Sequence, residues 1–106
     1  MGLEVYVTEM DVNTQRIEGG PNAQDEAVAR VFGNYPRQVL AEPNVPVLLT
    51  WGITSAHSWL TQSKQPWAQR PDGARQRPLP FDDDRKPTLA FFALRTAIDG
   101  APPRKG

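Results

Sequence analysis

Two carboxylates, Glu9 and Asp11, are the residues of this sequence whose type and spacing best suit chemistry. They follow residues 3–8, a segment rich in β-branched and aromatic residues, which is the composition of a β-strand. Odd-numbered positions of a strand share one face, so both carboxylates are expected on the same side. A carboxylate at a strand end can serve as a base, a nucleophile or a metal ligand, although a close pair can equally accept hydrogen bonds from backbone N–H groups.

Three tryptophans form a second group of candidates. Trp51 ends a later apolar run, and Trp59 and Trp67 lie in the segment that follows it. An exposed indole ring offers a flat surface to the apolar face of a sugar, whereas tryptophans are on average highly buried and serve packing. The sequence leaves both interpretations open for these three residues.

The other candidate groups argue against a metal, a cofactor or a serine nucleophile. His57 is the only histidine and there is no cysteine, so no pair has the spacing of metal ligands. The acidic run 82–84 lacks the spacing of a calcium loop and is expected to be a solvated turn. The glycine pair 19–20 does not open a phosphate-binding loop. None of the three serines lies in the Gly-x-Ser-x-Gly setting of a serine nucleophile: Ser55, Ser58 and Ser63.

The composition excludes several classes of protein. The 106 residues carry 12 basic and 12 acidic side chains, so no excess of positive charge indicates a nucleic-acid partner. No apolar run approaches the roughly 18 residues of a membrane span, and no signal peptide is visible. The absence of cysteine excludes a disulfide-rich scaffold, and eleven prolines argue against a helix bundle. The length suits a single domain.

The elements that would position the candidate residues alternate between strand and helix. Apolar residues three or four apart predict a helix over residues 24–41, with Asn22 as its N-cap and a kink at Pro36. Residues 45–53 form a continuous apolar run, which predicts a strand buried on both faces in a parallel sheet. A proline-punctuated loop over 54–87, a helix over 88–98 and a tail at 101–106 follow. This order predicts an α/β fold built on a βαβ unit.

Three stretches of the sequence together resemble one family. Residues 2–12 contain an apolar run that ends in Thr-Glu-Met-Asp, and residues 50–59 read Thr-Trp-Gly-Ile-Thr-Ser-Ala-His-Ser-Trp. Residues 78–82 read Pro-Leu-Pro-Phe-Asp, followed by Lys-Pro at 86–87 and Ala-Phe-Phe-Ala-Leu at 90–94. In this order, the three stretches resemble the seventh strand, the eighth strand and the closing segment of family-10 glycoside hydrolases, the endo-β-1,4-xylanases.

The resemblance implies a role for each of four residues. Glu9 matches the family's catalytic nucleophile, and Asp11 matches a supporting carboxylate that helps to orient a histidine contacting that nucleophile. Trp51 and Trp59 match the tryptophans that wall the subsite next to the cleaved bond. The implied reaction is retaining hydrolysis, which needs a second carboxyl group about 5–5.5 Å from the first. In the family this group follows an asparagine, and no Asn-Glu pair occurs in this sequence.

The fold that the resemblance implies is an eight-stranded β/α barrel of about 250 residues. Residues 1–106 would be the C-terminal portion of this single catalytic domain, with its seventh and eighth strand–helix units. We therefore expect a fragment that is inactive by itself, and whose partners are β-1,4-xylan or xylo-oligosaccharides and the missing N-terminal units. No nucleic-acid or membrane partner and no cofactor is expected, and the parent enzyme is expected to be secreted or periplasmic.

Two alternatives to this interpretation stay open. One is a non-catalytic carbohydrate-binding or interaction fragment that uses the tryptophan-bearing loop. The other is a piece of another barrel glycosidase that acts on a different β-glycan. The resemblance also has a departure, because Ser55 stands where the family usually has aspartate.

Overall fold

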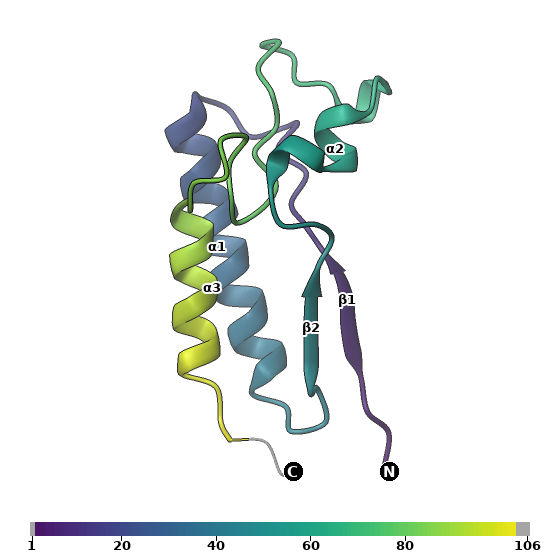
Figure 1. The fold of residues 1–106 in the computed structure, drawn as a ribbon, viewed down its shortest axis with the longest axis vertical. Coiled ribbons are helices and arrows are strands. Elements are labelled where there is room, and N and C mark those ends of the chain that lie inside the picture. The colour runs from purple at the N-terminus through teal and green to yellow at the C-terminus, as the bar shows by residue number, and fades with distance from the viewer. Residues whose placement is uncertain (1, 104–106) are drawn as a thin grey trace.

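The structure is a computed structural model that describes residues 2–103, and it consists of two parallel strands backed by two long helices (Figure 1). The strands are β1 (Tyr6–Met10) and β2 (Val47–Thr50), and the long helices are α1 (Pro21–Leu40) and α3 (Leu89–Asp99). Three short helical segments lie between β2 and α3: η1 (Ser55–His57), α2 (Trp59–Gln62) and η2 (Pro66–Ala68). The predicted α/β fold with a βαβ crossover is confirmed. Of the expected tail at 101–106, residues 104–106 lie outside the described residues.

Helix α1 begins earlier than its apolar pattern predicts. Gly20 is the N-cap and Pro21 the first helical residue, so the expected N-cap at Asn22 is wrong. Proline suits the first turn because its φ angle is already helical and its missing N–H needs no partner there. The helix then runs through Pro36, which is buried, and continues to Leu40. The second proline therefore removes one backbone donor without ending the helix.

The core lies between the strands and the two long helices. Its buried members are Met10 of β1, Val28 and Phe32 of α1, and Ala90 of α3. Val7 packs against the same cluster, although strict alternation along a strand would put it and Met10 on opposite faces. The strand register shifts between these two residues, and this irregularity lets both contact the core. The predicted alternation is therefore wrong near the end of β1.

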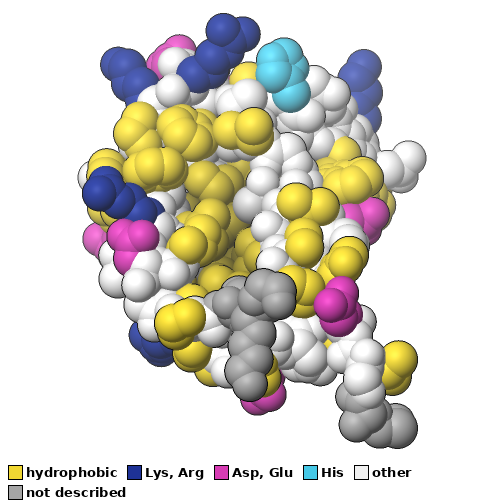
Figure 2. Space-filling view, turned by 60° about the horizontal axis from the view of Figure 1, so that its bottom comes forward, with side chains coloured by type: hydrophobic (Ala, Val, Ile, Leu, Met, Phe, Trp, Pro, Cys, Tyr) yellow, Lys and Arg dark blue, Asp and Glu magenta, His cyan; other side chains and the backbone are white. Residues whose placement is uncertain are grey.

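Strand β2 is shorter and more exposed than predicted. The side chains of Leu49 within it and Ile53 just beyond it are 53% and 68% exposed. The expectation of burial on both faces is wrong for this chain, because Leu48 packs against the core beneath the helices while Leu49, on the opposite face, is left exposed. Hydrophobic side chains also surround a hollow at the end of the molecule that carries both termini (Figure 2). The exposure of Leu49 and Ile53 leaves apolar surface on and beside β2 open.

The connection between β2 and α3 folds back on itself. Bridges join Thr54 to Phe81 and Phe81 to Pro87, so the beginning and the end of the connection lie together. Thr88 then caps α3 by accepting a hydrogen bond from the N–H of Ala90. The predicted helix over 88–98 is confirmed to within one residue at each end.

Candidate active site

The predicted site residues lie where the two strands end. Glu9 is exposed on β1, Asp11 directly follows that strand, and Trp51 directly follows β2. The backbone N–H of Trp51 donates to the Met10 carbonyl at 2.9 Å, and this hydrogen bond ties the two strand ends together. Gly52 then turns the chain with a φ of +100°, a conformation that favours glycine. The parallel strands thus present a carboxylate and an indole at their carboxyl ends, on the same side of the molecule.

Asp11 and Trp59, candidates on separate segments, are in direct contact. The indole N–H of Trp59 donates to a carboxylate oxygen of Asp11 at 2.6 Å. Trp59 opens α2, and the N-cap Ser58 accepts a hydrogen bond from the N–H of Leu60. Burial raises the pKa of Asp11 above its ordinary value, the hydrogen bond from Trp59 opposes this rise, and the charge of Glu9 adds to it. The loop after β2 therefore reaches back to the end of β1.

Replacing Asp11 with asparagine should raise the stability of the folded chain at pH 7 and leave it unchanged at pH 3. Asparagine can still accept the hydrogen bond from Trp59, but it carries no charge to be desolvated or repelled by Glu9. The stability linked to protonated Asp11 is complete below the unfolded-state pKa near 3.8 and is lost as the pH rises through the higher folded-state pKa. Urea unfolding followed by tryptophan fluorescence measures this difference when both proteins also carry Val5→Lys and Leu49→Lys, which place charge on the open sheet and keep the chain monomeric. A lower midpoint for Asp11→Asn at pH 7 would contradict the prediction.

Trp67 extends the group of aromatic side chains beside Asp11. Its ring centroid lies 4.9 Å from that of Trp59, with the two ring planes tilted by 48°. The Asn13 amide donates to the Trp67 carbonyl at 3.2 Å. No ring contact within residues 2–103 joins Trp51 to the other two indoles. All three tryptophans remain 43–48% exposed, so each offers indole surface to a ligand.

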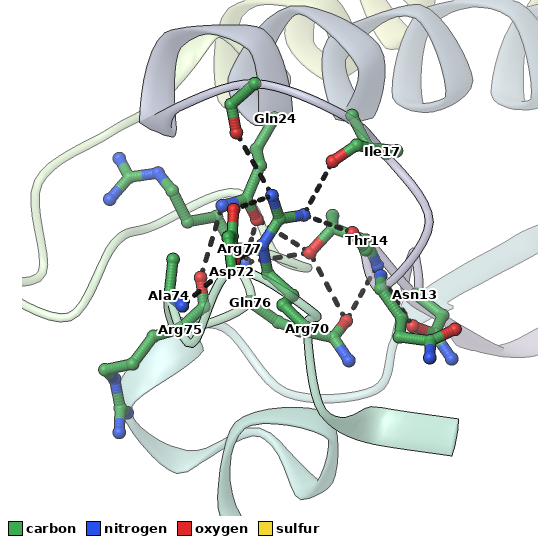
Figure 3. Close-up of polar contacts among 12 residues, drawn as sticks. Asn13, Thr14, Ile17, Gln24, Arg70, Asp72, Ala74, Arg75, Gln76 and Arg77 are labelled. Atoms are coloured by element: carbon green, nitrogen blue, oxygen red, sulfur yellow. Dashed lines mark hydrogen bonds and ion pairs between the residues drawn. The ribbon is translucent and has the colours of Figure 1, made fainter. Parts of the chain in front are cut away.

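A buried guanidinium joins the loop after β1 to the long connection (Figure 3). The Arg70 side chain is 2% exposed and donates to the carbonyls of Thr14, Ile17 and Gly19. It also donates twice to the Asp72 carboxylate, at 3.1 and 2.7 Å, and these hydrogen bonds are the largest cause of a lowered pKa at Asp72. A buried cation is stable only when its donors are satisfied, so Arg70 fixes the two segments relative to each other.

Two buried glutamines strengthen this link. Thr14 is fully buried, and its backbone N–H donates to the side-chain oxygen of Gln76 at 2.7 Å. The Thr14 hydroxyl donates to the side-chain oxygen of Gln24, also at 2.7 Å. The amide of Gln76 in turn donates to the Ala68 carbonyl at 2.6 Å. Ala68 directly follows Trp67, so the same polar cluster reaches the aromatic group.

Sequence reasoning does not identify this polar cluster, although one signal for it exists. Gln24 continues, at four-residue spacing, the buried stripe of α1 that includes Val28 and Phe32. A polar residue in a core stripe requires a buried partner, so Gln24 could have been recognised. Arg70 stands in a polar loop, where no local pattern distinguishes a buried arginine from a solvated one.

His57 and the acidic run 82–84 are the remaining candidates from the sequence. His57 is exposed in η1, and the run 82–84 forms the expected turn, in which the Asp82 carboxylate accepts from the N–H groups of Asp84 and Lys86 at 2.9 Å each. Within residues 2–103 no group of three or more His, Cys, Asp or Glu side chains could hold a metal ion. No helix in this described part is long and apolar enough to cross a membrane.

Comparison with known proteins decides the family. The sequence model described as Glycosyl hydrolase family 10 matches residues 1–97. The chain belongs to this family. It is also 35% identical over 94 residues to endo-1,4-beta-xylanase B of Neocallimastix patriciarum, an alignment that covers 89% of this chain and 9% of that protein. The resemblance found in the three motifs is therefore confirmed.

Solved structures of family-10 xylanases share the fold of this chain. A glycosylated endo-beta-1,4-xylanase from Gloeophyllum trabeum matches with a TM-score of 0.69 and 29% identity, over 92% of this chain and 28% of that chain. Xylanase 10B from Thermotoga petrophila RKU-1, in complex with xylobiose, matches with a TM-score of 0.61 and 25% identity, over 92% of this chain and 27% of that chain. The family-10 chain described here thus spans less than a third of each solved xylanase chain.

Proposed function

We propose that this chain forms the nucleophile-bearing part of a retaining endo-1,4-β-xylanase. The observation that carries the proposal is the group at the strand ends, where exposed Glu9 lies on β1, the hydrogen-bonded pair of Asp11 and Trp59 follows it, and Trp51 ends β2. A carboxylate nucleophile is one of the two carboxyl groups that retaining glycoside hydrolysis requires, and indole rings offer a flat surface on which a sugar can stack. Family membership and the likeness to a xylanase that holds xylobiose support β-1,4-xylan or xylo-oligosaccharides as the substrate.

The two strand–helix units of this chain would be the seventh and eighth of a β/α barrel. Parallel strands joined by a helical crossover are the repeating unit of such a barrel, and its active sites lie at the carboxyl ends of the strands. Residues 1–106 would be the C-terminal portion of one catalytic domain, and the remaining units would come from the part that this chain does not span. The whole enzyme would act outside the cytoplasm, because a polymeric substrate does not enter the cell.

In the proposed reaction, the Glu9 carboxylate attacks the anomeric carbon of a xylose unit as the glycosidic C–O bond breaks. A second carboxyl group, about 5–5.5 Å away and outside this chain, gives its proton to the leaving oxygen. The same group then takes a proton from water, which attacks the anomeric carbon and releases Glu9. Trp51 and Trp59 stack on the apolar face of the sugar, and Asp11 fixes the indole of Trp59.

A covalent trap tests the role of Glu9. Residues 1–97 would replace the matched segment of the Gloeophyllum trabeum xylanase, giving a chimera of full length. A 2-deoxy-2-fluoro-xylobioside with a good leaving group should add one glycosyl group to the peptide that contains Glu9, as seen by mass spectrometry. Glu4→Gln removes another exposed carboxylate of the same segment and should label normally, whereas Glu9→Gln should not. Labelling at another residue would refute the assignment.

The exposed indole surface favours one alternative, a fragment that binds carbohydrate without catalysis. Such a fragment would bind xylotriose equally well after Glu9→Gln and would lose binding after Trp51→Ala or Trp59→Ala. Titration calorimetry of the chain with xylotriose distinguishes this alternative. The same titration with cello-oligosaccharides would reveal whether a different β-glycan is the preferred ligand.

A further inference from the structure

We propose that Trp67 and Arg70 are positioning residues that hold the indole of Trp59 against the carboxylate of Asp11. The inference rests on the proposed function, because Trp59 and Asp11 are the residues placed there beside the nucleophile. Neither Trp67 nor Arg70 has to touch the sugar in this role. Each acts through the loop that it supports.

Trp59 is held from two sides. Its indole N–H bonds to Asp11 at 2.6 Å, and its ring meets that of Trp67 at a centroid distance of 4.9 Å and a tilt of 48°. Helix α2, which begins at Trp59, has only four residues, and so short a helix has little stability of its own. The contact with the Trp67 ring therefore restricts the indole rotation that would break the bond to Asp11.

Trp67 is in turn held by the loop that carries Asp11. Its carbonyl accepts a hydrogen bond from the Asn13 amide at 3.2 Å, and the neighbouring carbonyl of Pro66 accepts one from the Gln15 amide at 3.4 Å. Asn13 and Gln15 lie two and four residues after Asp11. The backbone at Pro66 and Trp67 is thus tied to the loop that follows β1.

Arg70 fixes the relative position of these two segments from the interior. Its guanidinium, 2% exposed, donates to three carbonyls of the loop after β1 and to Asp72 (Figure 3). Gln76 adds a second buried link by accepting from the N–H of Thr14 at 2.7 Å. Because burying an unpartnered guanidinium is costly, any shift of one segment away from the other would be opposed. The segment that carries Trp67 is therefore held in one place.

Protonation of Asp11 makes the contact observable without a sugar. Asp11 accepts from the Trp59 N–H, and Glu9 is the charged group that acts on it. A charged acceptor makes a stronger hydrogen bond than a neutral one, so the Trp59 indole N–H signal should shift as Asp11 titrates. The size of this shift reports how closely the indole is held.

NMR spectroscopy of the ¹⁵N-labelled chain, carrying Val5→Lys and Leu49→Lys on the open sheet to keep it monomeric, tests the proposal. The chain has three tryptophans, and Trp59→Phe assigns the titrating indole signal. Trp67→Ala should reduce the pH-dependent shift of this signal by about twofold or more, whereas Trp67→Phe, which keeps an aromatic ring, should retain most of it. Arg70→Lys keeps the charge but loses the two-point geometry, and it should also reduce the shift.

Trp51→Ala is the matched control, because Trp51 is 48% exposed where Trp67 is 43% exposed, and it should leave the shift unchanged. The proposal would be overturned by an undiminished shift in Trp67→Ala or by an equal loss of the shift in Trp51→Ala. It would also be overturned if the indole signals of the chain with all three tryptophans coincided, because no indole would then be held in a distinct place. No sugar is present in this experiment. A normal titration together with no labelling of Glu9 in the chimera would therefore refute the proposed function alone.

Discussion

The purified chain by itself should release no reducing sugar from xylan. Retaining hydrolysis needs two carboxyl groups about 5–5.5 Å apart, one to attack and one to protonate the leaving oxygen. The sequence contains Glu9 but no second glutamate in the Asn-Glu setting that the family resemblance requires. Without a proton donor the sugar–oxygen bond does not break at a measurable rate, so a reducing-sugar assay should match the buffer.

The chimera with the Gloeophyllum trabeum xylanase is the positive control for this assay, because the remainder of its chain comes from a xylanase. In the chimera, Glu9→Ala should lower the rate by about 10⁴-fold or more, as expected when a covalent nucleophile is removed. Glu4→Ala should change it little. Hydrolysis by the chain alone that is lost in Glu9→Ala would contradict the expectation of an incomplete site.

The isolated chain should also self-associate instead of remaining a folded monomer. Within residues 2–103 the two strands pair only with each other, so each has an unpaired edge, and two-stranded pairings are marginal alone. Four large apolar residues on and beside the strands are 49–68% exposed: Val5, Tyr6, Leu49 and Ile53. Figure 2 shows hydrophobic side chains around a hollow at the end where both termini lie. Exposed apolar surface of this kind favours association.

Light scattering with matched lysine substitutions tests the association. Val5→Lys combined with Leu49→Lys places charge on the open sheet and should shift the chain toward the monomer. Ile98→Lys on α3 is the control, because Ile98 is 52% exposed where Val5 and Leu49 are 49% and 53% exposed. This change, away from the strands, should leave association unchanged. A sharp two-state calorimetric melt of an unsubstituted monomer would be the contrary result.

The sequence by itself determined the elements whose signals are local. Helix α3 has a capping residue, Thr88, at its beginning and Gly100 at its end, so its bounds follow from neighbouring residues. The spacing of apolar residues identified α1, and the apolar run identified β2. The family, too, followed from contiguous motifs around Glu9 and Trp51, because such motifs do not depend on how distant segments meet.

Only the tertiary structure decided which distant residues meet. Asp11 and Trp59 are 48 residues apart, and Arg70 bonds to the carbonyl of Thr14 across 56 residues. The burial of a loop residue such as Arg70 depends on which segments fold over it, and the composition of the loop does not predict those segments. The exposure of β2 has a related cause, because an apolar strand is buried on both faces only where other parts of the fold cover both. Within residues 2–103 Leu48 packs against the core, and Leu49 on the opposite face stays exposed.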